Sequence, residues 1–560
     1  MKRINWMLLA VAALVVGSCS VKGPQPPDAE KMPFVIESNG NQRTDDYFWM
    51  RLSDDQKNAE VPDSQTVKVL NYLNAENDYA KAMMKHTEVL QDRLFEEMKG
   101  RIKENDETVP YLDNGYYYFV KYFQGKEYPV YYRRKDAPEQ QPEVLLDVNV
   151  LAEGYKYTGA GSPSVSRSNT LMAFSVDHVS RRQYTIYFKN LTTGELFPDT
   201  IANTTGQAVW ADDNKTVFYV EKDPETLRAA IVKKHVLCTP VSEDKLIFDE
   251  TDETFAVGLG MTKSKKYIQI FSNQTLTTEV MLIEAARPEG KAVVFEPRQA
   301  DHRYSVDHLN GQFYIYTNSN GATNFKLMKC ADNKPGMENW VEVIPHRPDV
   351  LLENSEIFDN YLVVDERIKG LTNIRIINLS DNSEHNLDFG EETYTAGISI
   401  NPNGNTSLLR YSYSSLTTPN SVYDYDMAAK TKTLLKQDSV QGGFDGSNYE
   451  SKRLWAKAAD GTMVPVSLVY RKGFVQDGKA PLLLYAYGSY GSSTDPYFRR
   501  NVISLLDRGF VYAIAHVRGG SEMGRQWYED GKLLKKINTF TDFNDCARFL
   551  INEKYTSPES

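Results

Sequence analysis

The spacing of apolar residues changes along the chain, and the first regular pattern is helical. Between Ser64 and Lys99 apolar residues recur three or four positions apart, which is the repeat of a helix that buries one face. Gly100 follows as a stop signal. The pattern predicts that residues 32–105 form a helical N-terminal segment.

From about residue 106 to residue 440 the helical repeat gives way to short strand patterns between turns rich in Asn, Asp, Gly and Ser. The strongest apolar runs return at a spacing of roughly 45 to 55 residues, which is the length of a four-stranded propeller blade. They are Tyr116–Val120, Leu171–Ser175, Thr216–Val220, Tyr267–Phe271, Gln312–Tyr316, Tyr361–Val364 and Ser407–Tyr411. The pattern predicts a seven-bladed β-propeller. An array of β-sandwiches is the alternative, but sandwiches impose no such long period.

Continuous apolar runs replace the alternating pattern in residues 441–560. Leu482–Ala486 and Phe510–His516 are typical of strands buried on both faces, and Thr541–Lys554 is typical of an amphipathic helix beside them. These elements indicate an α/β sheet. Two or three strands with one or two helices cannot cover both faces of such a sheet, so we expect it to be incomplete within these residues.

The start of the chain has the pattern of a targeting signal. A basic start precedes an apolar run from Trp6 to Val16, which is too short to span a bilayer comfortably, and small residues then lead to Cys19. This order resembles a lipobox. We expect residues 1–18 to be a lipoprotein signal peptide, Cys19 to carry the lipid and residues 19–31 to be a Pro-rich tether. The protein would then be lipid-anchored in a bacterial cell envelope, periplasmic or at the outer membrane. A plain secretory signal is the alternative.

Composition narrows the choice of partners. The chain has 560 residues, too many for one ordinary core, and a formal charge of -11 without a concentrated basic stripe, which argues against a nucleic-acid partner. The cysteines after Cys19 are Cys238, Cys330 and Cys546, an odd number at wide spacing. They predict no disulfide framework and no metal site, and we expect all three to be buried.

Two glycine-rich loops follow the predicted strands of the last stretch. The first, Leu484–Gly491, contains Tyr487, and in α/β hydrolases the loop after an early strand contributes to the oxyanion hole. Taken alone, such a loop is more often structural. The second, Val517–Gly524, places Ser521 among glycines, but Met523 stands where a nucleophile motif needs glycine. No G-x-S-x-G motif occurs in the sequence, so no Ser-Asp-His triad can be assembled from it.

These loops and their surroundings resemble the prolyl oligopeptidase family, and oligopeptidase B within it. The runs that carry the resemblance are Tyr485–Gly491, Leu505–Gly520, Trp527–Lys532, Tyr413–Pro419, Ser180–Tyr184 and Asp45–Trp49. The likeness covers nearly everything after the signal segment, and runs of this length rarely recur by chance.

The resemblance implies a fold and an activity. The fold is a seven-bladed β-propeller plus a partial α/β-hydrolase domain, residues 441–560, which is split around the propeller because the N-terminal helical segment packs with the hydrolase part. The activity is that of a serine-type endopeptidase that cuts short peptides after Arg or Lys and needs no cofactor. A prolyl-specific oligopeptidase and a non-catalytic, peptide-binding propeller lipoprotein are the alternatives.

The resemblance also implies roles for single residues. Tyr487 matches the oxyanion-hole tyrosine of the family, whose phenol donates to the developing oxyanion. Asp495 matches a carboxylate that receives the basic side chain of the substrate, although an exposed turn residue before Pro496 is the alternative. Tyr497 stands where many members have a second acid, which weakens the expectation of a dibasic preference.

In the family, the segment that resembles Tyr555–Ser560 leads directly to the strand and turn that bear the nucleophile. We therefore expect the 560-residue chain to lack the Ser, Asp and His of the triad and to be inactive by itself. A fragment of a working enzyme is favoured over a natural truncation, because an interrupted sheet would expose an apolar face and a free edge.

Overall fold

The computed structural model describes residues 23–560 and separates into two compact units, Met1–Lys99 and Gly100–Ser560. Each unit is described by itself. The predicted signal peptide and Cys19 lie outside the described residues. Within residues 23–560, no helix has both the length and the apolar character needed to cross a bilayer.

The first unit contains the predicted helices and a hairpin that the apolar pattern did not indicate. The hairpin is β1 (Phe34–Ser38) and β2 (Asn41–Asp45), and its two turn residues have positive φ, as a tight hairpin turn requires. The helical elements are η1 (Phe48–Met50), α1 (Asp54–Asn58), α2 (Ser64–Met84), η2 (Lys85–Thr87) and α3 (Glu88–Lys99). Asp63 begins α2 by accepting a hydrogen bond from the backbone N–H of Thr66. The helical prediction for Ser64–Lys99 is confirmed, with one tight turn inside it.

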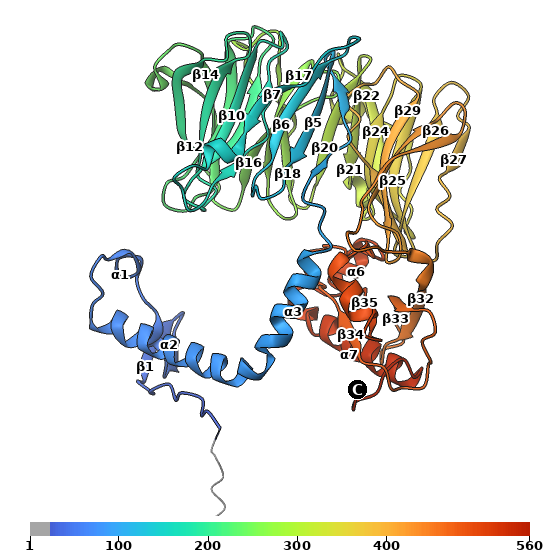
Figure 1. Cartoon of the computed structure of the whole chain (residues 1–560). Coiled ribbons are helices and arrows are strands. Elements are labelled where there is room, and N and C mark those ends of the chain that lie inside the picture. Colours follow the sequence, from blue (N-terminus) through green and yellow to red (C-terminus); the bar gives the residue numbers. More distant parts are fainter. Residues whose placement is uncertain (1–22) are drawn as a thin grey trace, which may run out of the picture. The chain divides into compact units, whose positions relative to one another are not determined.

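The second unit begins with the β-propeller (Figure 1). Blade 1 contains β3 (Asp106–Glu107), β4 (Tyr111–Asp113), β5 (Tyr116–Tyr122), β6 (Val130–Lys135) and β7 (Glu143–Asp147), followed by the short helix α4 (Val148–Leu151). Blades 2 and 3 contain β8 (Gly159–Ala160), β9 (Ser164–Val165), β10 (Leu171–Asp177), β11 (Tyr184–Asn190), β12 (Leu196–Trp210), β13 (Thr216–Lys222), β14 (Ala229–Val236) and β15 (Lys245–Asp249), with the turn η3 (Val241–Glu243). Together these sheets supply the first three blades.

Blades 4 to 7 each have four antiparallel strands in sequence order. Blades 4 and 5 contain β16 (Ala256–Met261), β17 (Tyr267–Asn273), β18 (Thr278–Glu284), β19 (Val293–Glu296), β20 (Tyr304–Leu309), β21 (Gln312–Thr317), β22 (Lys326–Ala331) and β23 (Val341–Ile344), with η4 (Ser319–Gly321) and η5 (Met337–Asn339). Blades 6 and 7 contain β24 (Val350–Ile357), β25 (Tyr361–Ile368), β26 (Leu371–Asn378), β27 (Glu384–Asn386), β28 (Tyr394–Ile398), β29 (Leu408–Ser415), β30 (Ser421–Asp426) and β31 (Thr431–Gln437). The seven-bladed prediction is confirmed.

Each apolar run predicted from the sequence falls on the second strand of one blade, namely β5, β10, β13, β17, β21, β25 and β29. The reason is burial. A second strand has ladder partners on both sides and a neighbouring blade on each face, so β10 and β13 are buried at six of their seven residues. The outermost strands alternate or are exposed, as β31 is, and give a weaker signal.

One long strand, β12, belongs to two blades. Its first part pairs with β11 as far as Thr204, and its last part, from Ala208 to Trp210, pairs with β13. The register shifts between the two parts, where Gly206 has a φ of 88°. A Cβ at Gly206 would lie 2.7 Å from Ser175 Oγ, so glycine is needed at this bend.

Blades 1 and 7 meet without a shared ladder among the described strands. Side chains of blade 7 reach backbone carbonyls of blade 1 instead: Arg410 donates to the Pro110 carbonyl at 2.7 Å, and Asn403 donates to that of Leu112 at 2.8 Å. The propeller is therefore closed at this seam by side-chain hydrogen bonds.

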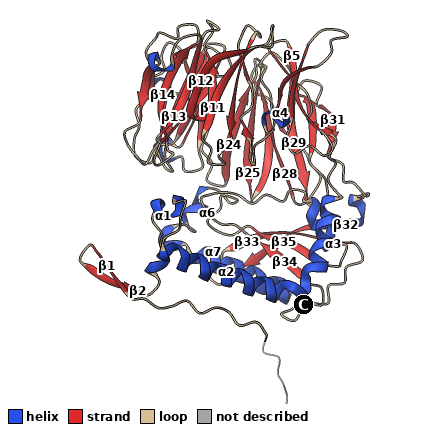
Figure 2. Cartoon of the chain, turned by 60° about the vertical axis from the view of Figure 1, so that its left-hand side comes forward, coloured by secondary structure: helices blue, strands red, loops and turns tan. Residues whose placement is uncertain are grey.

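The remaining residues of the second unit form the hydrolase part, a mixed sheet in the order β32–β33–β35–β34 with helices beside it (Figure 2). Its elements are η6 (Gly446–Asn448), β32 (Tyr449–Lys457), β33 (Met463–Arg471), β34 (Leu482–Tyr485), η7 (Arg500–Val502), α5 (Ile503–Leu506), β35 (Val511–Ala515), α6 (Arg525–Glu529), η8 (Leu533–Lys535) and α7 (Ile537–Asn552). Cys546 and Leu550 of α7 pack into the sheet's core cluster. The predicted strand at Phe510–His516 is buried throughout β35, and the predicted helix begins four residues earlier than expected.

Two expectations about burial are wrong. Within the described residues β34 is an edge strand, paired only with β35, so Leu483 and Tyr485 are exposed, and the run Leu482–Ala486 is not buried on both faces. Cys330 and Cys546 are buried as expected, but Cys238 is exposed, because it lies in a turn after β14 with a φ of 66°.

Candidate active-site loop

The loop after β34 is held by glycine contacts that leave no room for a side chain. Gly488 has a φ of 64°, and a Cβ there would lie 2.5 Å from Thr539 Cγ2. Gly519, in the loop after β35, has a φ of 103°, and a Cβ there would lie 2.0 Å from the Gly488 carbonyl oxygen. The two predicted loops therefore pack backbone against backbone, and the Gly491 N–H donates to the Gly519 carbonyl at 2.9 Å.

A lysine from the start of α7 ties the first loop down. Lys536 Nζ donates to the Gly488 carbonyl at 2.5 Å and to Ser489 Oγ at 2.7 Å. Burial lowers the pKa of Lys536 from its ordinary value. No local sequence pattern selects this lysine, because it lies almost fifty residues from the loop that it binds.

A buried ion pair fixes the second loop. Arg518 donates through Nε and Nη2 to both oxygens of Asp542, at 2.9 and 2.6 Å, and through Nη1 to Asp460 at 2.7 Å. Asp542 is fully buried on α7. The hydrogen bonds that Arg518 donates to Asp542 and Asp460 raise the pKa of Arg518, so the guanidinium is charged at all relevant pH values.

Tyr487 lies on this rigid support, directly after β34, and its side chain is 49% exposed. No hydrogen bond to another group is recorded for its hydroxyl within residues 23–560. A phenol that is exposed, unpaired and held by a rigid loop can donate to an oxygen atom of a ligand without first breaking a contact.

Asp495 lies eight residues further on, and the structure places it against the propeller. Arg367 of β25 donates to its two carboxylate oxygens at 2.7 and 3.2 Å, and donates to Glu353 at 2.9 Å. Arg367 is buried, whereas the Asp495 side chain keeps 26% of its surface exposed. Asp495 is thus part of an ion pair between the propeller and the hydrolase part, a contact that sequence reasoning missed.

A buried Ser-His-Glu arrangement occurs nearby and has the composition of a triad. Ser467 Oγ lies 2.8 Å from His516 Nε2, and His516 Nδ1 lies 4.0 Å from Glu522. Thr393 and Arg453 both donate to Ser467 Oγ, so the serine hydroxyl donates to His516. All three groups are buried, and burial holds the pKa of His516 well below its usual range. A serine without access and a histidine that resists protonation cannot perform acyl transfer, so this arrangement is structural.

Glu522 is the member of that arrangement whose carboxyl group is incompletely hydrogen-bonded. Its Oε1 accepts from the Thr494 N–H at 2.8 Å, but its Oε2 is buried without a partner. Burial raises the pKa of Glu522 to about 7. No group of three or more His, Cys, Asp or Glu side chains within the described residues is arranged to hold a metal ion.

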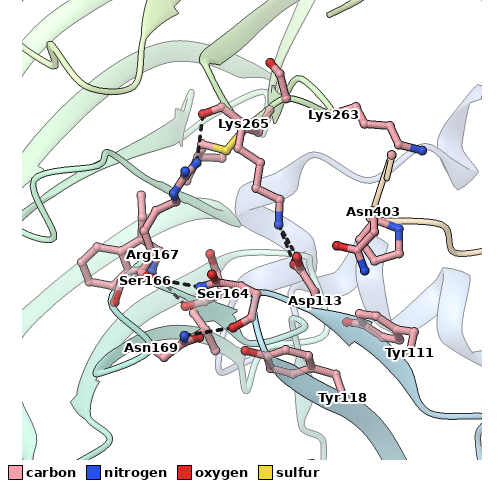
Figure 3. A pocket seen from close by; sticks show the side chains of 18 of the residues that line it. Tyr111, Asp113, Tyr118, Ser164, Ser166, Arg167, Asn169, Lys263, Lys265 and Asn403 are labelled. Carbon is pink, nitrogen blue, oxygen red and sulfur yellow. Dashed lines mark hydrogen bonds and ion pairs between the residues drawn. The ribbon is translucent and has the colours of Figure 1, made fainter. Parts of the chain in front are cut away.

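A cavity of about 590 Å³ lies among turns that join first and second strands of several blades (Figure 3). Lys265 of blade 4 donates to both oxygens of Asp113 in blade 1, at 2.5 and 2.7 Å. Arg167 of blade 2 donates to the Lys265 carbonyl at 3.4 Å. These contacts join nonadjacent blades across the turns that line the cavity.

Comparisons with known proteins agree with this architecture. The model of the prolyl oligopeptidase N-terminal beta-propeller domain matches residues 26–438, and the model of the prolyl oligopeptidase family matches residues 496–560. Dipeptidyl aminopeptidase BI of Pseudoxanthomonas mexicana is 44% identical over 99% of this chain and 78% of its own length. Protease 2 of Moraxella lacunata is 33% identical over 95% of this chain and 76% of its own length.

Solved structures give the same result. Oligopeptidase B from Leishmania major is 34% identical, with a TM-score of 0.87, over 96% of this chain and 78% of that chain. The propeller and the mixed sheet are thus those of a serine peptidase fold, and the chain belongs to the prolyl oligopeptidase family.

Proposed function

We propose that this protein is an oligopeptidase of the serine type that cleaves short peptides after Arg or Lys. The observation that carries the proposal is the exposed, unpaired phenol of Tyr487 on a loop fixed by glycine contacts and Lys536. In this mechanism a serine activated by histidine attacks the peptide carbonyl, and Tyr487 donates to the oxyanion that develops. A donor of this kind stabilises the transition state by about 3 kcal/mol.

The preference for basic residues is assigned to Asp495. A guanidinium or ammonium group that enters a partly desolvated site is favoured only where a carboxylate meets it. Arg367 engages both oxygens of Asp495, but a quarter of that side chain remains exposed. The substrate cation therefore binds at the exposed side, and Arg367 acts as a fixed partner that orients the carboxylate.

The propeller restricts which peptides enter. The Lys265–Asp113 ion pair joins blades 1 and 4 beside the cavity formed by the turns of several blades, which supports a limit to short or unfolded chains. The size limit is tested by Lys265→Met, which should raise cleavage of long peptides relative to short ones. An unchanged ratio would contradict the assignment.

The membrane anchor is proposed from the sequence alone. The lipobox pattern ending at Cys19 supports a lipid-anchored protein of the bacterial cell envelope. Replacing Cys19 by Ala should abolish incorporation of radiolabelled palmitate and release the protein from the membrane fraction. Continued labelling of the variant would reject the anchor.

A second activity is favoured by one relative. Dipeptidyl aminopeptidase BI is 44% identical to this chain, and its name describes removal of dipeptides from a free N-terminus. The two activities differ in one respect that can be measured, since an aminopeptidase needs a free α-amino group and an endopeptidase accepts a blocked one.

The experiment uses the protein expressed from its complete gene. Fluorogenic peptides ending in Arg, Lys or Pro are offered with free and with blocked N-termini. Cleavage of blocked Arg and Lys peptides supports the endopeptidase. Cleavage only of reporters with a free N-terminus supports the aminopeptidase. Cleavage after Pro supports a prolyl-specific enzyme, and no cleavage of any reporter supports a non-catalytic peptide-binding protein.

Tyr487→Phe provides the test of the site itself. The variant should lose about 10²- to 10³-fold in kcat with little change in KM, because the hydrogen bond forms only in the transition state. Tyr497→Phe is the matched control, since it removes a neighbouring exposed phenol and should leave kcat nearly unchanged. Equal activity of Tyr487→Phe and the unmodified enzyme would reject the oxyanion role.

A further inference from the structure

A cavity of about 310 Å³ lies between blades 4 and 5 and the hydrolase part. The propeller side is formed by Leu276, Asp301, Arg303, Asn318, Thr323 and Phe325, and the hydrolase side by Arg525, Glu529 and Lys532. All of these residues belong to the second unit. Three of its nine lining residues, Arg303, Arg525 and Lys532, are cationic.

Among the cations that line the cavity, Arg303 is the one with no ion-pair partner within residues 23–560. Its guanidinium lies 5.2 Å from the centre of the Phe325 ring, which supports it from one side. Within the described residues the guanidinium has no recorded hydrogen bond or ion pair, and it is partly buried. Desolvation and the nearby Arg525 lower the pKa of Arg303. A half-buried guanidinium with open donors is unfavourable by itself and is stabilised by an anion.

Arg525 and Lys532 form the opposite wall. Both pair with Glu529, at 2.9 and 2.5 Å, and both lie over the face of Tyr528, at 4.7 and 5.0 Å from the ring centre. Glu529 thus balances only one of these two cations. With Arg303 there are three cations and, with Asp301, two carboxylates, so one positive charge remains unbalanced.

We propose that this cavity binds one carboxylate group of a peptide, with Arg303 as its principal ligand and Arg525 and Lys532 beside it. A guanidinium matches a carboxylate through two parallel hydrogen bonds, and a single unbalanced charge suits a monoanion better than a phosphate dianion. The inference rests on the proposed peptidase function. It adds that an acidic side chain or the C-terminal carboxylate of the peptide is recognised there.

The position of the cavity agrees with this role. A Cβ on Gly491 would lie 3.5 Å from Tyr528, so the loop that bears Tyr487 borders the ring on which Arg525 and Lys532 rest. A peptide that reached from Tyr487 past Tyr528 would bring its carboxylate to Arg303. The cavity would therefore be a second binding site for the peptide, and its positive charge is opposite to that of Asp495.

Isothermal titration calorimetry on the complete protein tests the proposal with three unlabelled probes. They are tetra-alanine with a free carboxyl group, tetra-alanine amide, and Ala-Asp-Ala-Ala amide. These peptides lack Arg and Lys and carry an acetylated N-terminus, so neither the endopeptidase nor the aminopeptidase activity consumes them. At least one peptide with a carboxylate should bind tenfold or more tightly than tetra-alanine amide. The preferred peptide distinguishes a C-terminal carboxylate from an acidic side chain.

Arg303→Met should remove this preference, and Arg303→Lys should retain part of it. Met keeps the apolar contact with Phe325, and thermal unfolding shows whether the variant is folded. Arg287→Met is the matched control, since Arg287 is an exposed propeller arginine outside the cavity, and it should preserve the preference. Equal binding of acid and amide peptides, an unchanged preference in a folded Arg303→Met, or no binding of any probe overturns the proposal. Cleavage of Arg or Lys reporters in any of these cases leaves the peptidase function standing.

Discussion

Glu522 shows how one buried side chain can make stability depend on pH. Its carboxyl group is almost fully buried, it has one partner at Oε1 and none at Oε2, and its pKa is raised to about 7. The unfolded chain ionises this group near its ordinary value of 4.5. The folded protein therefore holds the proton more tightly, and its stabilising contribution is complete below about pH 4.5 and is lost as the pH rises through 7.

Glu522→Gln tests this dependence. The unmodified protein should lose up to about 3 kcal/mol of unfolding free energy relative to the variant between pH 4.5 and pH 8, because a shift of this size corresponds to that energy. Urea unfolding at several pH values measures the difference. Glu195→Gln, at an exposed position, is the control and should track the unmodified protein. A pH-independent difference for Glu522→Gln would contradict the raised pKa.

Single residues were also the level at which sequence reasoning was least complete. Tyr487 could be selected, because an apolar run followed by glycines is visible in the sequence. Lys536 and Arg303 could not, since a surface lysine or arginine has no pattern of its own, and its partner lies far away in the chain. Asp495 was selected as an open carboxylate, but its bidentate contact with Arg367 joins positions 128 residues apart and has no local signal.

At the scale of elements, the two loops that follow β34 and β35 behave as one support. The Gly519 Cα approaches the Gly488 carbonyl so closely that a methyl group would overlap it. Strand and helix positions here were predictable from apolar runs, whereas this backbone contact was not. A free edge of the sheet was expected, but that β34 forms it within the described residues was not predictable, because an apolar run does not reveal how many neighbours a strand has.

Comparison of Gly519→Ala with Gly443→Ala separates the free-energy cost of this close contact from the cost of backbone strain. Gly443 also has a positive φ, 90°, but has open space around its Cα, so Gly443→Ala should cost only the strain of about 1 to 2 kcal/mol. Gly519→Ala should cost clearly more and should lower peptidase activity, because the Tyr487 loop must move. Chemical unfolding of both variants gives the comparison, and equal losses would show that the contact is not tight.

At the scale of the whole second unit, Arg367 connects the propeller to the hydrolase part through Asp495 while it also pairs with Glu353. The long-period repeat predicted the propeller and the continuous runs predicted the sheet, but neither pattern predicts how the two are joined. Such contacts depend on single side chains such as Arg367, which lies near the end of β25 and is not marked by either pattern.

A double-mutant cycle measures this connection. Arg367→Met should destabilise the protein by about 3 to 5 kcal/mol, because it leaves two carboxylates without their buried partner. Asp495→Asn should cost less, and the pair should show a coupling energy above about 1 kcal/mol. Arg287→Met, which removes an exposed ion pair with Glu284, should change stability by less than about 1 kcal/mol. Additive effects of Arg367→Met and Asp495→Asn would rule out a coupled pair.

The strand β12 has a consequence for how the propeller comes apart. Other blades that follow one another in sequence are linked by loops, which can be cleaved while both sheets stay intact, but blades 2 and 3 share the strand β12. A single protease cut near Gly206 would break β12, which is both the outermost strand of blade 2 and the innermost strand of blade 3. These two blades should accordingly exchange their amide hydrogens as one cooperative block, twice the size of any other in the ring.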